Sequence, residues 1–484
     1  MIKGIVKIKE FFKNTVQPQK IDWLVLIAIS LLLFLSHTYN DILITTRQGI
    51  NLWNALFSGH ILNFYSYNYN IVSGNVVYNI PQGAWYDFLV YVVYAIWNFP
   101  LWILEKFFKV DIMNSILCIL WSKTMLIFFL GLSAKMINKI CLELKINENL
   151  AKWCVFSYLS STLVFSSLFI ISQDNIISLS IMLIGLLMYL QEKTRKFIFW
   201  FALAIAFKYF ALFLFIPLIL LKEKRIFHIL KYLISGMSLA IITKLIFSFD
   251  IATKATGKLQ NDLYSFLIKN SLQLSIGNVS IFFLLTALFY IFCYYKKINS
   301  MEDLYKFSIY VSFLSFAIFF GFAYTYPYWS ILLAPFTILL VFQNHNKFRF
   351  NLLIETAMTA SFVMAQMVVF YWCYGIKTIK PMLLPKIFGQ VSSLPKVFSI
   401  DHIQLLTKGG GTKNNILSAL LAIFLACLIT LAIVNFPKDN KNEISEDIVI
   451  DRSLFWGRLA ISGGICLIPI AGYFAGVLYK LLFY

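Results

Sequence analysis

The chain has 484 residues, of which 60% are hydrophobic, 18% aromatic and only 13% charged. A soluble globular chain carries roughly 25% charged residues, so this composition excludes a water-soluble fold. The net charge of +19 does not indicate nucleic-acid binding, because the basic residues lie in short loops beside apolar segments, where the positive-inside bias places them. We therefore expect one all-α membrane domain over 1–484, with about 11–13 transmembrane helices of roughly 20 residues each.

The N-terminal region is basic and precedes a first apolar run at 22–38. No small-residue cleavage site follows this run, so we expect it to remain as the first helix, with a cytoplasmic N-terminus at 1–21. The next segment, 39–83, is then the first outer loop. Within it, the spacing of apolar residues over 49–57 predicts an amphipathic helix in the membrane interface, ended by Gly59.

Two apolar regions conflict with simple alternation. The region 85–133 can hold two spans, but the basic residues after it favour the cytoplasmic side, so we expect its aromatic first half, which contains Pro100, to lie in the interface. The stretch 197–221 is bounded by basic residues at both ends. We expect a re-entrant pair of half-helices with Lys208 at the turn, and the alternative is a single span that disobeys the charge rule.

The loops of the second half divide by charge. Basic loops on the cytoplasmic side are expected at 294–306, 344–350 and 437–452, and outer loops at 250–277, 323–328 and 374–413. The loop 374–413 contains six lysines. Long loops cross the membrane regardless of charge, or this loop binds an anionic ligand.

Asp41 follows directly after the first apolar run, at the expected outer edge of the membrane. A carboxylate at this place can act as a general base if partial burial raises its pKa toward neutral pH, and Arg47 lies six residues further on. The alternative is a solvated loop residue. Asp87, just before the next apolar segment, is a second candidate carboxylate that would contact substrate.

Asp174 and Lys208 are ionisable residues inside or beside apolar sequence. Charges at membrane depth cost about 2.5–3.5 kcal/mol on insertion scales, which makes them functional candidates. Lys208 at a re-entrant turn can neutralise a lipid-linked phosphate, with Asp174 and Gln173 contacting substrate. The alternative is that Asp174 and Lys208 form a structural ion pair.

Aromatic residues gather at 322–336, where Tyr326 and Trp329 can stack on a sugar ring or belong to an aromatic belt. Asp401 and His402 are a weak candidate for a metal ligand or base, and the cysteines have no CxxC spacing. We therefore expect no cofactor, with a divalent metal as the less favoured alternative.

Three stretches together resemble the GT-C superfamily of glycosyltransferases that use polyprenyl-phosphate sugars. The first is the opening helix followed by Asp41 and a long outer loop, similar to the catalytic first-loop aspartate of that superfamily. The second is 172–225, where a Gln-Asp pair precedes a helix and a Phe-Lys pair interrupts the next one. The third is 322–336, similar to the aromatic-then-proline element of later helices.

The resemblance implies an inverting hexosyltransferase at the outer face of the cell membrane. Asp41 would deprotonate a hydroxyl of a glycan or glycolipid acceptor, which attacks the anomeric carbon of a polyprenyl-phosphate sugar. Lys208, or Arg47 as second choice, would bind the donor phosphate. Ile42 follows Asp41 in place of a second acidic residue, which disfavours a metal-assisted version. Two other functions stay open: a lipid-linked oligosaccharide flippase or transporter, and a polysaccharide polymerase that depends on the basic loop 374–413.

Overall fold

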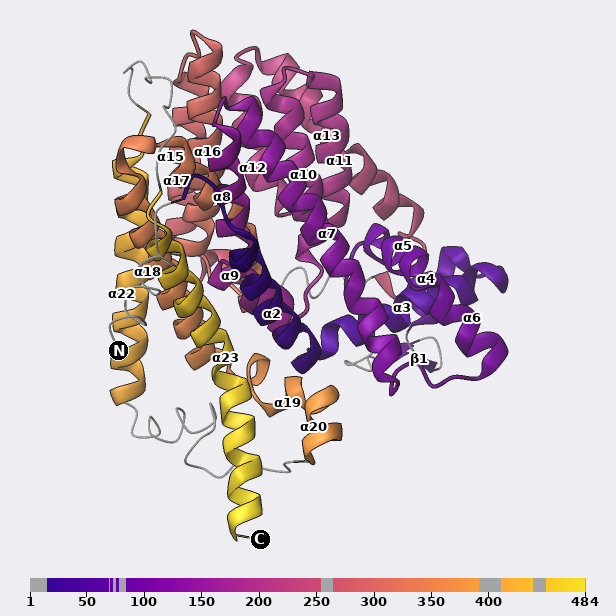
Figure 1. The fold of residues 1–484 in the computed structure, drawn as a ribbon. Helices are drawn as coiled ribbons and strands as arrows, with labels where there is room; N and C mark the ends of the chain where they lie inside the picture. The colour runs from indigo at the N-terminus through magenta and orange to yellow at the C-terminus, as the bar shows by residue number, and fades with distance from the viewer. Residues whose placement is uncertain are drawn as a thin grey trace, which may run out of the picture.

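The fold is built almost entirely from helices (Figure 1). The computed structural model describes residues 15–68, 70–72, 75–77, 84–253, 264–390, 411–437 and 450–483. The α-helices of the first half are α2 (Lys20–Ser36), α3 (Asn40–Phe57), α4 (Phe64–Tyr67), α5 (Phe88–Trp97), α6 (Phe99–Phe108), α7 (Ile116–Glu143), α8 (Glu148–Leu159), α9 (Thr162–Val164), α10 (Asn175–Leu190), α11 (Thr194–Phe207), α12 (Ala211–Lys222) and α13 (Ile226–Ile246). Those of the second half are α15 (Ile281–Tyr295), α16 (Met301–Phe322), α17 (Ala334–Gln343), α18 (Phe348–Val369), α19 (Ile376–Ile379), α20 (Leu383–Phe388), α22 (Gly411–Val434) and α23 (Arg452–Phe483).

Shorter elements connect these helices. One-turn or tight helices are η1 (Ile61–Asn63), the π-helix η2 (Phe165–Ile170), η3 (Pro327–Leu332), η4 (His345–Lys347) and η5 (Tyr371–Cys373). Two antiparallel hairpins pair β1 (Asn70–Val72) with β2 (Asn75–Val77) and β3 (Ser271–Leu274) with β4 (Gly277–Ser280).

The chain is a multi-pass membrane protein. Six of the described helices are long and apolar enough to cross a membrane, or up to nine if each of three bent helix pairs is one span. The expected number of about 11–13 spans, each of roughly 20 residues, is higher. The difference arises because four further apolar helical segments, including α10, α12 and α15, have only 10–17 residues.

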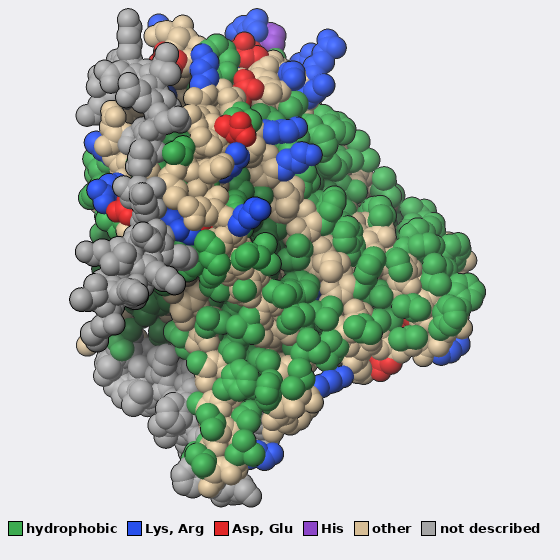
Figure 2. All heavy atoms as spheres, in the orientation of Figure 1, with side chains coloured by type: hydrophobic (Ala, Val, Ile, Leu, Met, Phe, Trp, Pro, Cys, Tyr) green, Lys and Arg blue, Asp and Glu red, His purple; other side chains and the backbone are tan. Residues whose placement is uncertain are grey.

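Helix ends with basic residues gather at one end of the molecule, which we call the basic end. Gln191 donates to Glu143 at 2.8 Å, and Tyr305 donates to the same carboxylate at 3.0 Å. Lys224 donates to the carbonyl of Cys293 at 2.9 Å. These contacts join the ends of α7, α10 and α15 with the starts of α13 and α16. Figure 2 shows Lys and Arg side chains over this end and a broad hydrophobic band beside it.

The opposite end holds most of the long connections, and we call it the loop end. The backbone N–H of Thr38 donates to the carbonyl of Thr378 at 2.7 Å, and that of Tyr324 donates to the carbonyl of Phe266 at 3.1 Å. Four connections meet there, each as far as it is described: 39–83, 250–277, 323–328 and 374–413.

Helices α11 and α12 form an antiparallel hairpin. Glu192 before α11 and Lys222 at the end of α12 form an ion pair at 2.9 Å. A continuous helix would separate these two positions by roughly 45 Å at 1.5 Å per residue, so this pair excludes a single span. The rings of Phe201 and Phe215 stack between the two helices at 5.1 Å. Lys208 therefore lies at the turn of the hairpin, far from the basic end.

The first long connection is a helical platform rather than an open loop. In Figure 1, α3, α4, α5 and α6 gather beside the main bundle. Helices α5 and α6 have 10 residues each and bend by 65° relative to one another. Trp53 on α3 donates to the carbonyl of Ala95 at 2.8 Å, and Trp102 on α6 donates to Asn54 on α3 at 2.8 Å. These contacts hold both short helices against α3.

Helix α3 begins nine residues earlier than the amphipathic segment expected at 49–57. Asp41 therefore lies in the first turn of a helix instead of in a loop after the first helix. The N-terminal dipole of a helix favours an acidic residue in this turn, which explains locally why α3 starts here. Gly59, which was expected to end the helix, is the second residue after its last residue, Phe57, and has φ +77°.

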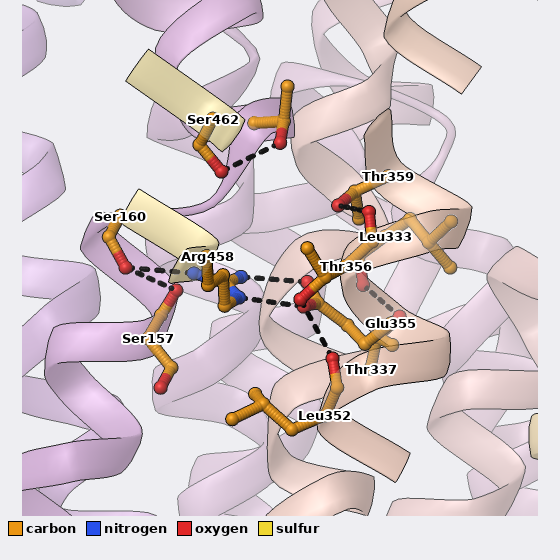
Figure 3. A network of polar contacts seen from close by, with 11 residues as sticks. Ser157, Ser160, Leu333, Thr337, Leu352, Glu355, Thr356, Thr359, Arg458 and Ser462 are labelled. Atoms are coloured by element: carbon orange, nitrogen blue, oxygen red, sulfur yellow. Dashed lines mark hydrogen bonds and ion pairs between the residues drawn. The ribbon is translucent and has the colours of Figure 1, made fainter. Parts of the chain in front are cut away.

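A buried ion pair fixes the C-terminal helix in the bundle (Figure 3). Arg458 on α23 donates to both carboxylate oxygens of Glu355 on α18 at 2.8 Å, and to the hydroxyl of Ser160 at 2.8 Å. The Arg458 and Glu355 side chains are 1% and 0% exposed. A buried charge is tolerated only with such partners. Because Ser160 lies at the break between α8 and α9, the pair also fixes the segment that leads to Gln173.

Candidate active site

Three helix breaks meet around Asp41 at the loop end. The side-chain amide of Gln173, in the turn before α10, donates a hydrogen bond to Oδ2 of Asp41. Its neighbour Asp174 forms an ion pair with Lys208, with 3.2 Å between Oδ1 and Nζ. The structure thus brings four residues singled out from the sequence into one group, which we call the Asp41 cluster: Asp41, Gln173, Asp174 and Lys208.

The acidic oxygens of the Asp41 cluster have unused hydrogen-bonding capacity. Neither oxygen of Asp174 accepts a hydrogen bond within the described part of the chain, although its side chain is 3% exposed. Asn175 and Ser172 also have buried side-chain oxygens without partners among the described residues. Buried polar groups are normally paired. The free acceptors around the Asp41 cluster therefore suit a polar ligand that would supply their hydrogen bonds.

The turn that presents Gln173 and Asp174 is strained and held from both sides. Ser172 has φ +58°, a left-handed conformation that residues other than glycine adopt rarely. Ser167 on η2 and Asn175 on α10 both donate to the carbonyl of Tyr328, each at 2.8 Å. Strained residues and π-helical turns such as η2 gather at functional sites. The two hydrogen bonds fix the direction in which Gln173 points.

One side of the Asp41 cluster carries alternating charges and aromatic rings. Nζ of Lys208 lies 3.4 Å from the ring centroid of Tyr86. The next residue, Asp87, accepts a hydrogen bond from Tyr209, and Nζ of Lys244 lies 4.8 Å from the Tyr209 ring centroid. Ring faces attract cations, so these tyrosines fix the two lysines. We call this the cationic side of the site.

The other side of the Asp41 cluster consists of tyrosines. Tyr39, just before α3, donates a hydrogen bond to Cys373. The rings of Tyr326 and Tyr328 stack with centroids 5.2 Å apart and an angle of 10° between their planes. The charge of Asp41 acts on Tyr39 and Tyr328 of this side and on Tyr86 of the cationic side, so Asp41 lies where the two sides meet. We call this the tyrosine side.

Burial changes the acidity of the two carboxylates outside the spanning helices. Asp41 lies beyond the end of α2, and burial together with the negative charge of Asp174 raises its pKa to about 6, against the smaller opposite effects of Gln173 and Lys208. Burial likewise raises the pKa of Asp87 to about 6, against the charges of Lys244 and Lys208. Carboxylates with such values can take up and release protons near neutral pH.

Other residues considered from the sequence lie elsewhere or have a different role. Arg47 forms an ion pair with Glu105 on α6, so it holds the platform instead of reaching the Asp41 cluster. Trp329 is buried and packs between the turn of the α11–α12 hairpin and the tyrosine side, with its ring centroid 5.0 Å from Phe210 and 5.3 Å from Tyr326. The candidates Asp401 and His402 lie outside the described residues.

The described residues contain no group of three or more His, Cys, Asp or Glu side chains that could hold a metal ion. Several site residues were missed from the sequence, namely Tyr39, Tyr86, Ser167 and Asn175. Tyr39, Tyr86 and Asn175 are direct or near sequence neighbours of Asp41, Asp87 and Asp174, and this adjacency could have identified them. Ser167 lies in an apolar segment and had no such signal.

Comparison of the chain with protein-family models, with curated proteins and with solved structures finds no match.

Proposed function

We propose that this protein is a membrane-embedded inverting glycosyltransferase of the GT-C type, which moves a sugar from a polyprenyl-phosphate donor to a glycan or glycolipid acceptor. The observation that carries the proposal is the position of Asp41. Its carboxylate is held by Gln173, lies beside the Asp174–Lys208 ion pair and separates a cationic side from a tyrosine side. A transfer between a phosphate donor and a hydroxyl acceptor needs a base at such a boundary.

In the proposed reaction, Asp41 removes the proton of the acceptor hydroxyl while the hydroxyl oxygen attacks the anomeric carbon. A new carbon–oxygen bond forms, and the bond from that carbon to the phosphate oxygen breaks, with inversion at the carbon. The electron pair leaves with the polyprenyl phosphate, and the proton stays on Asp41 until solvent removes it. The atoms balance without a metal or cofactor.

Lys208 is the residue proposed to bind the donor phosphate. An ammonium group has three N–H donors, and the one charged partner of Lys208 among the described residues is Asp174, at 3.2 Å. A phosphate oxygen can therefore bind Lys208 without displacing Asp174. Donors placed where charge develops on a leaving group are a large part of enzymatic rate enhancement, which is the role proposed for Lys208.

The tyrosine side is proposed to hold the acceptor. Tyr39 and Tyr326 are half-buried rings of this side, and their faces suit the apolar face of a sugar. Aromatic rings combine a large apolar surface with a hydroxyl that can bond to a polar partner, as a saccharide offers both. This assignment places the acceptor hydroxyl on the side of Asp41 away from Lys208.

The proposed orientation follows from charge. Basic residues flank membrane helices on the cytoplasmic side, so the basic end is proposed to be cytoplasmic and the loop end, with the Asp41 cluster, extracellular. Counting the shorter helices, the chain would cross the membrane about 11 times, with the α11–α12 hairpin re-entrant from the cytoplasmic side. Helix α10 has 16 residues, or about 24 Å. That length would place Asp174 slightly below the outer membrane boundary.

The test is sugar transfer in membranes that contain Asp41→Asn. Labelled polyprenyl-phosphate hexoses are incubated with these membranes, and the label entering the glycan and glycolipid fractions is counted. We expect about 10²–10⁴-fold slower transfer, the usual contribution of a general base. Glu105→Gln is the matched control, since it changes a carboxylate of the same platform that pairs with Arg47. Equal transfer by wild type and Asp41→Asn would exclude Asp41 as the base.

A transporter of lipid-linked saccharides is the second candidate function. The observation that favours it is the Asp174–Lys208 pair, because paired charges at membrane depth also mark substrate pathways. Purified protein in proteoliposomes distinguishes the two functions. A transporter moves a labelled lipid-linked saccharide across the bilayer and forms no glycosidic bond.

A further inference from the structure

Lys123 is a buried cation in the apolar helix α7. Its side chain is 0% exposed, and none of the ion pairs among the described residues includes it. An ionisable residue inside a membrane helix is costly, so it is expected to have a function. Nothing in the proposed sugar transfer uses Lys123.

The ammonium group of Lys123 binds the end of another helix. Its Nζ donates to the carbonyls of Phe34 and His37, at the C-terminal end of α2, and lies 4.4 Å from the ring centroid of Phe34. The last carbonyls of a helix have no partner inside the helix, and the helix dipole makes that end negative. The ammonium of Lys123 supplies both the hydrogen bonds and the opposite charge.

This contact lies at the break that places Asp41. After Ser36 the chain leaves α2, and α3 begins at Asn40 with an axis bent by 71° from that of α2. Asp41 is four residues beyond His37, whose carbonyl Lys123 binds. His37 itself is fully buried, and neither of its ring nitrogens has a hydrogen-bond partner in the described part of the chain. The break is therefore held mainly through its backbone.

We infer that Lys123 is the positioning residue for Asp41: its buried ammonium binds the last carbonyls of α2, holds the break between α2 and α3, and so keeps Asp41 within hydrogen-bond distance of Gln173. Without the ammonium, the carbonyls of Phe34 and His37 would be buried without partners. The chain would then satisfy them by continuing α2, and this change would move Asp41 away from Gln173.

A crosslinking experiment tests this positioning without any assumption about the reaction. Asp41→Cys and Gln173→Cys are combined in a background whose seven native cysteines are replaced by alanine, because Gln173 is as buried as they are and Cys373 contacts Tyr39 beside Asp41. Membranes with this protein are treated with a short bis-methanethiosulfonate crosslinker. We expect Lys123→Met, which keeps the chain length and removes the charge, to lower the crosslink yield at least fivefold. Lys135→Met is the control, because Lys135 is an exposed lysine of the same helix. It should leave the yield unchanged.

The outcomes separate positioning from stability. An unchanged crosslink yield in a folded Lys123→Met protein would overturn the inference. Should that variant fail to fold, Lys123→Gln keeps a hydrogen-bond donor without the charge, and a wild-type yield in it contradicts a role for the ammonium. Loss of yield in a folded Lys123→Met protein, or in Lys123→Gln where Lys123→Met fails to fold, supports the inference when the Lys135→Met yield is intact.

A kinetic experiment rests on the proposed function and is evaluated separately. In sugar transfer, Lys123→Met should lower kcat about tenfold and leave KM for the polyprenyl-phosphate donor unchanged, because the donor binds at Lys208. Lys123→Arg, which keeps charge and donors, should restore part of the loss. If no variant and not even wild type transfers sugar, the proposed function fails, and the crosslink still decides on Lys123.

Discussion

Breaking the buried ion pair between Arg458 and Glu355 is expected to destabilise the protein strongly. In the wild-type protein the Glu355 carboxylate accepts two hydrogen bonds from Arg458, both at 2.8 Å. Arg458→Met removes both donors and leaves this carboxylate fully buried with no cation. Removing one partner of a buried pair costs about 3–5 kcal/mol, whereas replacing both partners by neutral groups is often close to neutral. The same change in an exposed pair costs less than about 1 kcal/mol.

The measurement is a double-mutant cycle on unfolding. Arg458→Met, Glu355→Gln and the double variant are unfolded in mixed dodecyl maltoside and sodium dodecyl sulfate micelles, followed by circular dichroism. We expect the double variant to be more stable than the sum of the single losses predicts, with a coupling of about 2–3 kcal/mol. Arg349→Met is the control, since Arg349 pairs with Asp451 at the same distance of 2.8 Å but is 73% exposed. Additive losses within about 0.5 kcal/mol would refute the reasoning.

Two further predictions concern the site and its platform. Sugar transfer should fall to half its high-pH rate near pH 6, because the pKa of Asp41 is raised to about 6 and only the ionised carboxylate accepts a proton. Gln173→Ala should move this acid limb of the pH–rate profile to higher pH, since the Gln173 amide stabilises the charged form of Asp41. A profile without an acid limb contradicts the role of Asp41 as the base. Gly49→Ala should destabilise the protein by about 1–3 kcal/mol, because the added Cβ would lie 2.7 Å from Cβ of Tyr94 and 2.8 Å from its backbone carbon. Gly131→Ala, where a Cβ meets open space, should change the thermal unfolding midpoint little, and equal effects of the two substitutions would show that α3 does not pack tightly on α5.

The class of the protein was predictable from composition and charge alone. With 60% hydrophobic and 13% charged residues, no soluble arrangement can cover the apolar surface, so membrane helices follow directly. The basic residues at both ends of 197–221 also predicted that the two ends lie on the same side of the membrane, because basic flanks favour the cytoplasmic side. The number of spans was not fixed by the sequence, because apolar length alone does not say whether a segment of 10–17 residues crosses, bends or packs on a neighbour.

The candidate site depended on tertiary structure in a way that no local pattern reveals. Asp41, Asp174 and Lys208 each stand out from the sequence as charges beside apolar residues, and the stretches that contain them carry the resemblance to the GT-C superfamily. Their meeting at one place depends on where separate helices end and turn. Arg47 obeys the same rule and yet pairs with Glu105, because its position on α3 turns it toward α6.

Lys123 shows the remaining gap most clearly. It is a charge in an apolar segment like Lys208, but its partners are backbone carbonyls of another helix, and every residue has such a carbonyl. No residue type marks the position that it binds. The sequence by itself determined that Asp41 follows the first helix, with charges near it. Only the packing of α7 against the end of α2 decided where that helix stops, because a carbonyl gains its partner in space and not along the chain.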